Sequence, residues 1–138
     1  MRIKDFKVIV EGTAKAPALV TGTALSFWGG VNAATGMVQD VHHDLCGEDL
    51  RGKFLCVPYD RGSCSSSGVM LEMLRQGTNP VGLLCIEAEA VLALGPIIGE
   101  KMYNRSLAIR TVSESDFKNI PPHCTVEFTK DEIIIEEI

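Results

Sequence analysis

The sequence predicts an α/β domain in which a partly parallel sheet is flanked by helices and extended by antiparallel strands. Short apolar runs at Lys53–Pro58, Val81–Ile86 and Ser106–Val112 are suited to buried strands, and helical patterns lie between them. Strands that alternate with helices pair in parallel, because each crossover helix returns the chain to the same end of the sheet. A length of 138 residues fits one domain over residues 1–138.

The N-terminal part predicts two strands and a long irregular segment. Phe6–Val10 alternates weakly, and after a turn at Gly12 the run Ala16–Val20 is expected to be its neighbour. Ala24–Asp40 contains three glycines among small and apolar residues. Each glycine inside a helix costs roughly 1 kcal/mol, so this segment is predicted to be a loop or bent strand.

Two helices are predicted in the second half. Ser65–Gln76 begins with serines, carries apolar residues on one face and ends before Gly77. Ala88–Leu94 predicts a short helix that is ended by Gly95, with Pro96 placed to start another turn.

A hairpin is predicted at the end of the chain. Thr125–Phe128 and Ile133–Ile135 are apolar stretches joined by a turn around Lys130-Asp131. About as many strands are therefore expected outside the strand–helix–strand units as inside them.

The charge and hydropathy of the chain exclude two classes of partner. Thirteen Lys and Arg against eighteen Asp and Glu give a net charge of -5 with no basic run, so nucleic acid is not an expected partner. The most apolar region, Val81–Gly99, is interrupted by two glutamates, a glycine and a proline, so no membrane span is expected. Lys4, Asp5 and Lys7 break any secretory apolar run at the N-terminus, so a cytoplasmic location is expected.

Three of the five cysteines lie among apolar or small residues, which favours reduced, buried thiols over metal ligands or disulfides. The five cysteines are an odd number at irregular spacings, without a CxxC pair or a Cys/His cluster. No metal is expected to be held by this chain alone.

The segment Pro58–Gly68, PYDRGSCSSSG, is the strongest candidate for a site. It joins a predicted parallel strand to a helix N-terminus, where unpaired backbone N–H groups and the helix dipole favour an anion. Its serines add hydroxyls, and Arg61 adds a charge suited to carboxylate or phosphate. The plainer alternative is a helix capped by Ser65 or Ser66. The segment is neither a P-loop nor a nucleophile elbow, and Cys64 is expected to be a packing residue.

Two further motifs precede this segment. In SFWGG, Ser26–Gly30, the tryptophan either packs in the core under a loop or forms a pocket wall or subunit contact. In VHHDLCG, adjacent His42 and His43 point opposite ways if extended, and surface or capping roles are expected for them. His123 is expected to be an exposed turn residue.

Taken in order, these motifs resemble the swivel-domain family of aconitase X proteins. The residues that carry the resemblance are ALSFWGGVNAATG (Ala24–Gly36), HDLCGEDLRGKFLCVPYDRGSCSSS (His43–Ser67) and the stretch Gly77–Met102. The family includes the archaeal phosphomevalonate dehydratase small subunit and part of the bacterial cis-3-hydroxyproline dehydratases.

The resemblance implies a swivelling β/β/α domain and a hydro-lyase activity shared, as a heterodimer, with a larger subunit that carries an iron–sulfur cluster. In the wider aconitase superfamily a Gly-Ser-Ser-Arg loop supplies the base, and placing that loop on Tyr59–Ser65 makes Ser63 the proton acceptor. Ser65 stands where aconitases have a substrate-binding arginine, so that role does not carry over. The expected substrate-binding residues are Arg61, Gly62, Cys64, Ser65 and Ser67.

The activity that the resemblance implies is dehydration of (R)-5-phosphomevalonate to trans-anhydromevalonate 5-phosphate, a small anionic substrate. The alternatives are a cis-3-hydroxy-L-proline dehydratase subunit and a non-catalytic anion-binding module. The residues expected at a pocket wall or subunit contact are Ser26, Phe27, Trp28, Gly29, Gly30 and His43.

Overall fold

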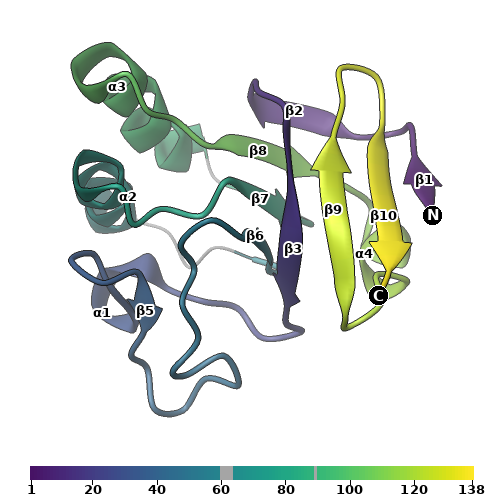
Figure 1. The fold of residues 1–138 in the computed structure, drawn as a ribbon, viewed down its shortest axis with the longest axis horizontal. Coiled ribbons are helices and arrows are strands. Elements are labelled where there is room, and N and C mark those ends of the chain that lie inside the picture. Colours follow the sequence, from purple (N-terminus) through teal and green to yellow (C-terminus); the bar gives the residue numbers. More distant parts are fainter. Residues whose placement is uncertain (60–63, 89) are drawn as a thin grey trace.

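The computed structural model describes residues 1–59, 64–88 and 90–138, with the side chains of Cys64 and Ser65 left out. Its main sheet has the strand order β1–β10–β9–β3–β6–β7–β8–β2 (Figure 1). The strands are β1 (Arg2–Ile3), β2 (Lys7–Val10), β3 (Ala14–Val20), β6 (Phe54–Cys56), β7 (Gly82–Cys85), β8 (Ala108–Thr111), β9 (Cys124–Phe128) and β10 (Ile133–Glu137). A separate small ribbon pairs β4 (Val31–Asn32) with β5 (Met37–Val38).

The centre of the sheet is parallel, as predicted. β3 pairs with β6, β6 with β7 and β7 with β8, all in parallel, whereas the strands outside this centre pair antiparallel. β3 changes partner along its length, because Ala14 to Pro17 pair with β9 and Ala18 to Val20 pair with β6. One long strand thus joins the antiparallel part of the sheet to the parallel part.

The predicted neighbourhood of the first two strands is wrong. β2 pairs with β8, with Lys7 opposite Thr111, and β3 lies elsewhere in the sheet. Alternation along β2 specifies which side chains face the core but not which strand supplies the hydrogen bonds.

Helices cover one face of the central strands (Figure 1). On the opposite face, side chains of the short helix Glu114–Lys118 and of the hairpin strands β9 and β10, which belong to the same sheet, form a second core with those strands. Along β6, Leu55 belongs to the core under the helices and Phe54 to the core on the opposite face. Burial on both faces explains why the central strands are continuous apolar runs. The helical elements are α1 (Phe27–Gly30), α2 (Cys64–Gln76), the 3-10 turn η1 (Ala90–Ala93), α3 (Leu94–Tyr103) and α4 (Glu114–Lys118).

α2 confirms the predicted helix and its stop, since Gly77 follows with φ of 77°. The predicted helix Ala88–Leu94 is confirmed in part, as the 3-10 turn η1 over Ala90–Ala93. The predicted stop at Gly95 is wrong, because α3 begins at Leu94 and runs through Gly95 and Pro96. Pro96 lies in the first turn of α3, where a backbone N–H has no helical acceptor to lose. Among the residues that the structure describes, no helix is long and apolar enough to cross a bilayer.

The C-terminal hairpin is confirmed, with Ile133 opposite Phe128 across the turn. The short helix α4 was not predicted. Its signal was present in the sequence, because the Ser113 hydroxyl caps the helix by accepting a hydrogen bond from the Asp116 amide at 3.1 Å.

Candidate functional site

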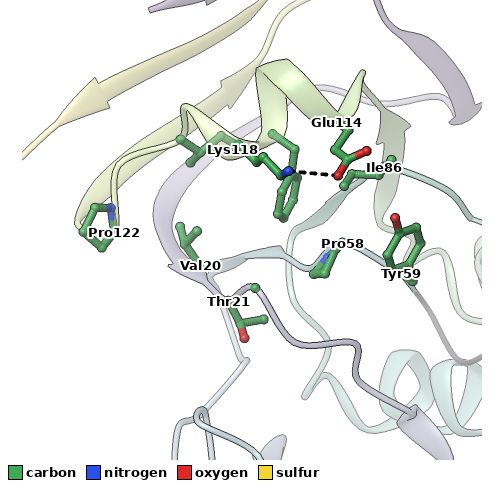
Figure 2. A pocket seen from close by; sticks show the side chains of 11 residues that line it. Val20, Thr21, Pro58, Tyr59, Ile86, Glu114, Lys118 and Pro122 are labelled. Atoms are coloured by element: carbon green, nitrogen blue, oxygen red, sulfur yellow. Dashed lines mark ion pairs between the residues drawn. The ribbon is translucent and has the colours of Figure 1, made fainter.

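A groove follows the edge of the sheet where the parallel strands end. A cavity of about 460 Å³ is lined by Val20 at the end of β3 and Thr21 after it, by Pro58 and Tyr59 after β6, and by Ile86 after β7. The residues of α4 and the turn that follows it close the opposite wall (Figure 2). Ligands of open α/β sheets bind beyond the carboxyl ends of parallel strands, and this groove lies there.

The groove continues across the sheet toward its other edge. Two adjoining hollows, of about 370 and 350 Å³, share Ile86, Glu87 and Thr111 and reach Lys7 at the start of β2. Tyr59 lines both the first hollow and the second, so its ring stands at the junction between them.

Charged side chains of both signs line this groove. Lys118 and Glu114 form an ion pair at 3.0 Å at the rim of the first hollow, one helical turn apart (Figure 2). Lys7 and Glu87 line the hollows farther along. None of these four residues was predicted to line a site, because the tertiary fold brings them together from separate segments.

The predicted catalytic loop is attached to this groove at its N-terminal side. Tyr59 is the last residue described before the loop, and Cys64 and Ser65 begin α2 immediately after it. Arg61, Gly62 and Ser63 lie outside the described residues.

The capping alternative is wrong for Ser65 and Ser66, because both lie inside α2 and past its N-cap position. α2 already begins at Cys64, and Ser66 is fully buried, with no hydrogen-bond partner for its Oγ atom among the described residues. Ser67 was predicted to bind substrate. Its Oγ atom accepts a hydrogen bond from the Gly95 amide at 2.8 Å, which places this hydroxyl at the contact between α2 and α3.

The SFWGG segment divides into a buried part and an exposed part. Phe27 is fully buried and Gly30 is buried, whereas 65% of the Trp28 surface is exposed to solvent, so the core-packing interpretation of this tryptophan is wrong. The segment is only nominally helical: Trp28 has ψ of 121° and Gly29 has φ of 79°. This break turns the indole outward, and none of the described groove residues comes from this segment.

The two adjacent histidines differ in burial, although their backbone forms a turn and not the extended segment that would point them opposite ways. His42 is exposed, while His43 is 5% exposed and hydrogen-bonded on both ring nitrogens. Its Nδ1 atom accepts from the Leu45 amide at 3.0 Å, so Nε2 carries the proton that is donated to the Thr23 carbonyl at 3.1 Å. His43 thus fastens the loop after β3, and its ring is not directed into the groove. His123 is exposed, as predicted.

The described side chains of this chain do not fit a metal or an iron–sulfur cluster. No three His, Cys, Asp or Glu residues in residues 1–59, 64–88 and 90–138 lie close enough together to bind a metal. Burial also raises the pKa of the Cys56 and Cys124 thiols, which disfavours the thiolate that a metal requires.

Comparisons with known proteins agree with this fold. The family model described as the Aconitase X swivel domain matches residues 4–137. A phosphomevalonate dehydratase small subunit from Methanopyrus kandleri is 45% identical over 93 residues, 67% of this chain and 69% of that protein. The crystal structure of Thermococcus kodakaraensis aconitase X in its holo-form superposes with a TM-score of 0.85 at 27% identity, over 99% of each chain.

A second group of relatives is much longer than this chain. The cis-3-hydroxy-L-proline dehydratase of Hypocrea jecorina is 40% identical over 111 residues, which are 80% of this chain and 19% of that protein. This chain therefore spans about a fifth of the hydroxyproline dehydratases that it matches. On its family match over residues 4–137 and its shared fold, the chain belongs to the aconitase X swivel domain family.

Proposed function

We propose that this chain is the small subunit of a hydro-lyase that dehydrates (R)-5-phosphomevalonate to trans-anhydromevalonate 5-phosphate. The observation that carries the proposal is made on either side of residues 60–63: Tyr59 lines the groove at the carboxyl ends of the parallel strands, and α2 begins at Cys64. Relatives that match most of this chain are named small subunits of phosphomevalonate dehydratase, and this supports the substrate.

Ser63 is the proposed proton acceptor. Dehydration removes a proton from the carbon next to a carboxylate, the C–H electron pair forms the new double bond, and the hydroxyl group leaves as water. A serine alkoxide is strong enough to take that proton, but it needs stabilisation near neutral pH. The unpaired N–H groups of the first turn of α2 and the dipole of this 13-residue helix favour negative charge at its N-terminus.

The proposal includes a larger subunit, in a heterodimer, that holds the iron–sulfur cluster of the complex. The relatives' designation as small subunits supports a larger partner. The described side chains of this chain do not fit a cluster, so the proposal assigns the cluster to the larger subunit. In this arrangement the swivel chain supplies the base and one wall of the active site, and Arg61 supplies positive charge for the substrate's carboxylate or phosphate.

A second substrate, cis-3-hydroxy-L-proline, is favoured by the other group of relatives. A phosphorylated acid requires additional cations, whereas an imino acid requires a carboxylate for its ammonium group. The groove offers both types, with Lys7 and Lys118 beside Glu87 and Glu114. Assays with both substrates are therefore the deciding measurement.

The test is dehydration by the anaerobically purified complex of this chain with its larger subunit. Ser63→Ala is expected to lower kcat about 10²–10⁴-fold, the usual contribution of a positioned proton acceptor, with the complex still assembled. Ser66→Ala is the matched control: the buried Ser66 hydroxyl has no partner among the described residues, so turnover is expected to persist.

Turnover that survives Ser63→Ala would remove the base assignment. Turnover of the imino acid alone would keep the reaction type and change the substrate. A wild-type complex that binds anions but dehydrates neither acid would leave the non-catalytic anion-binding module as the better description.

A further inference from the structure

The helix α3 is built with its small residues inside and its large apolar residues outside. Its buried residues are Gly95, Pro96 and Gly99. Its large apolar residues face solvent: Leu94, Ile97, Ile98 and Met102 are 51%, 46%, 38% and 64% exposed. A surface helix normally shows the reverse arrangement, with its large apolar residues toward the core.

The glycines explain why these side chains cannot turn inward. A Cβ atom at Gly95 would lie 2.6 Å from the Ser67 carbonyl oxygen, and one at Gly99 would lie 2.7 Å from Leu74 Cδ1. The backbones of α3 and α2 therefore lie close together at Gly95 and Gly99. This contact leaves no room between the two helices for large side chains, so the large apolar side chains of α3 remain on its outer side.

A shallow groove of about 200 Å³ between the two helices extends this apolar surface. Leu71 of α2 and Val91 of η1 line it together with Leu94 and Ile98 of α3. We call the six apolar residues the α3 strip: Leu71, Val91, Leu94, Ile97, Ile98 and Met102. Contiguous exposed apolar surface of this kind marks an interaction site more often than a solvent face.

We infer that the α3 strip is the docking surface for an apolar face of the larger dehydratase subunit, an inference that rests on the proposed function. The groove also contains Gly68, the fifth residue of α2, so the strip begins within two helical turns of the proposed catalytic loop. A partner that contacts the first two turns of α2 would therefore lie close to the strip.

The relatives supply a second argument for this occupant. In the hydroxyproline dehydratases the matched segment is 19% of the polypeptide, so about four fifths of each protein lies beyond it. In those proteins the remaining part lies on the same polypeptide, whereas a small subunit needs a separate partner chain for it. The exposed Lys101 lies on the same face of α3 as Leu94 and Ile97, seven and four residues from them, so a cation accompanies the apolar side chains of the strip. A permanent partner agrees with the apolar majority of this surface, because the centres of such interfaces are depleted of charge.

The experiment measures the affinity between this chain and its larger subunit under anaerobic conditions. The double variant Ile97→Arg/Met102→Arg places two charges on the strip at positions that solvent reaches, since Ile97 is 46% and Met102 64% exposed. The Kd is expected to rise at least about tenfold, as for central apolar contacts of an interface. At saturating larger subunit, kcat should return to near the wild-type value, because the strip touches no reacting group.

Val8→Arg is the matched control. Val8 is 45% exposed, like Ile97, but it lies on β2 at the edge of the sheet, and its substitution should leave the Kd unchanged. Urea unfolding of each variant confirms that the chain is folded. Equal weakening by Val8→Arg, or an unchanged Kd for the double variant, would overturn the docking assignment.

The outcome separates this inference from the proposed function. If the complex is active and the double variant has the wild-type Kd for the larger subunit, the docking surface is refuted and the proposed activity stands. A complex that depends on the strip but dehydrates neither substrate refutes the proposed activity alone. A wild-type chain that self-associates through the strip and does not bind the larger subunit would identify a second copy as the occupant and would overturn the inference.

Discussion

At the scale of single residues, burial divides the described cysteines into different chemical environments. Cys46 is exposed, whereas Cys56 and Cys124 are buried on the hairpin side of the sheet. Burial raises the pKa of the Cys56 thiol well above its usual range, and the neighbouring Cys124 and Cys85 raise it further. Burial, followed by the charge of Glu137, also raises the pKa of Cys124.

These pKa shifts predict selective alkylation. The thiolate is the reactive form, and a raised pKa keeps Cys56 and Cys124 protonated at pH 8, while Cys46 stays accessible. Iodoacetamide treatment of the native chain, followed by peptide mass spectrometry, should modify Cys46 and spare Cys56 and Cys124. In concentrated urea all three should react. Modification of Cys56 in the native protein at the rate of Cys46 would contradict its burial.

At the scale of elements, the contact between α2 and α3 depends on close backbone packing. The Ser67 hydroxyl accepts the Gly95 amide, and the same glycine leaves no space for a Cβ atom beside the Ser67 carbonyl. Local sequence patterns suggest a helix break at Gly95, but the tertiary contact uses that residue inside α3.

Gly95→Ala is therefore expected to destabilise the fold. The added methyl group must separate two backbones, and overpacking of this kind costs about 1–3 kcal/mol of unfolding free energy. Gly68→Ala is the matched control, since no atom of the described residues lies within 4 Å of its Cβ position, and it should stabilise α2 by about 0.5–1 kcal/mol. Urea unfolding curves measure both effects. A gain in stability for Gly95→Ala would show that the helices are not this close.

At the scale of the whole molecule, Arg110 joins the parallel part of the sheet to the C-terminal hairpin. It extends from β8, is 3% exposed, and donates to the carbonyl oxygens of Thr129 and Glu132 at 2.5 and 3.0 Å. Its guanidinium also lies over the rings of Phe6 and Phe128, at 4.4 and 4.6 Å from their centroids. Strands from both ends of the chain thus meet around one cation.

Arg110→Met should weaken this closure. It removes two hydrogen bonds to the hairpin turn and both ring contacts, so a loss of about 2–4 kcal/mol is expected. Lys130→Met removes an exposed positive charge from the same turn and serves as the charge control, with little change expected. Thermal unfolding of both variants is the measurement. Equal losses of stability in the two variants would mean that positive charge near the hairpin, and not the hydrogen bonds and ring contacts of the Arg110 guanidinium, stabilises it.

The sequence alone determined the local elements and the family motifs of this protein. The central apolar runs, the stop of α2 at Gly77 and the C-terminal hairpin all depend on neighbours a few residues away, so periodicity and turn chemistry predict them. The position of the candidate loop between a parallel strand and a helix N-terminus follows from the same local signals.

Only the tertiary structure decided which segments meet. Local patterns predicted a different partner for β2, which pairs with β8, and offered core packing for Trp28, which is exposed. They did not predict that α3 turns its large apolar side chains outward. The charged residues around the groove were missed for the same reason, since Lys7, Glu87 and Lys118 come from distant parts of the chain. Local periodicity specifies which side of an element is apolar, whereas burial, partner and site depend on contacts between residues far apart in sequence.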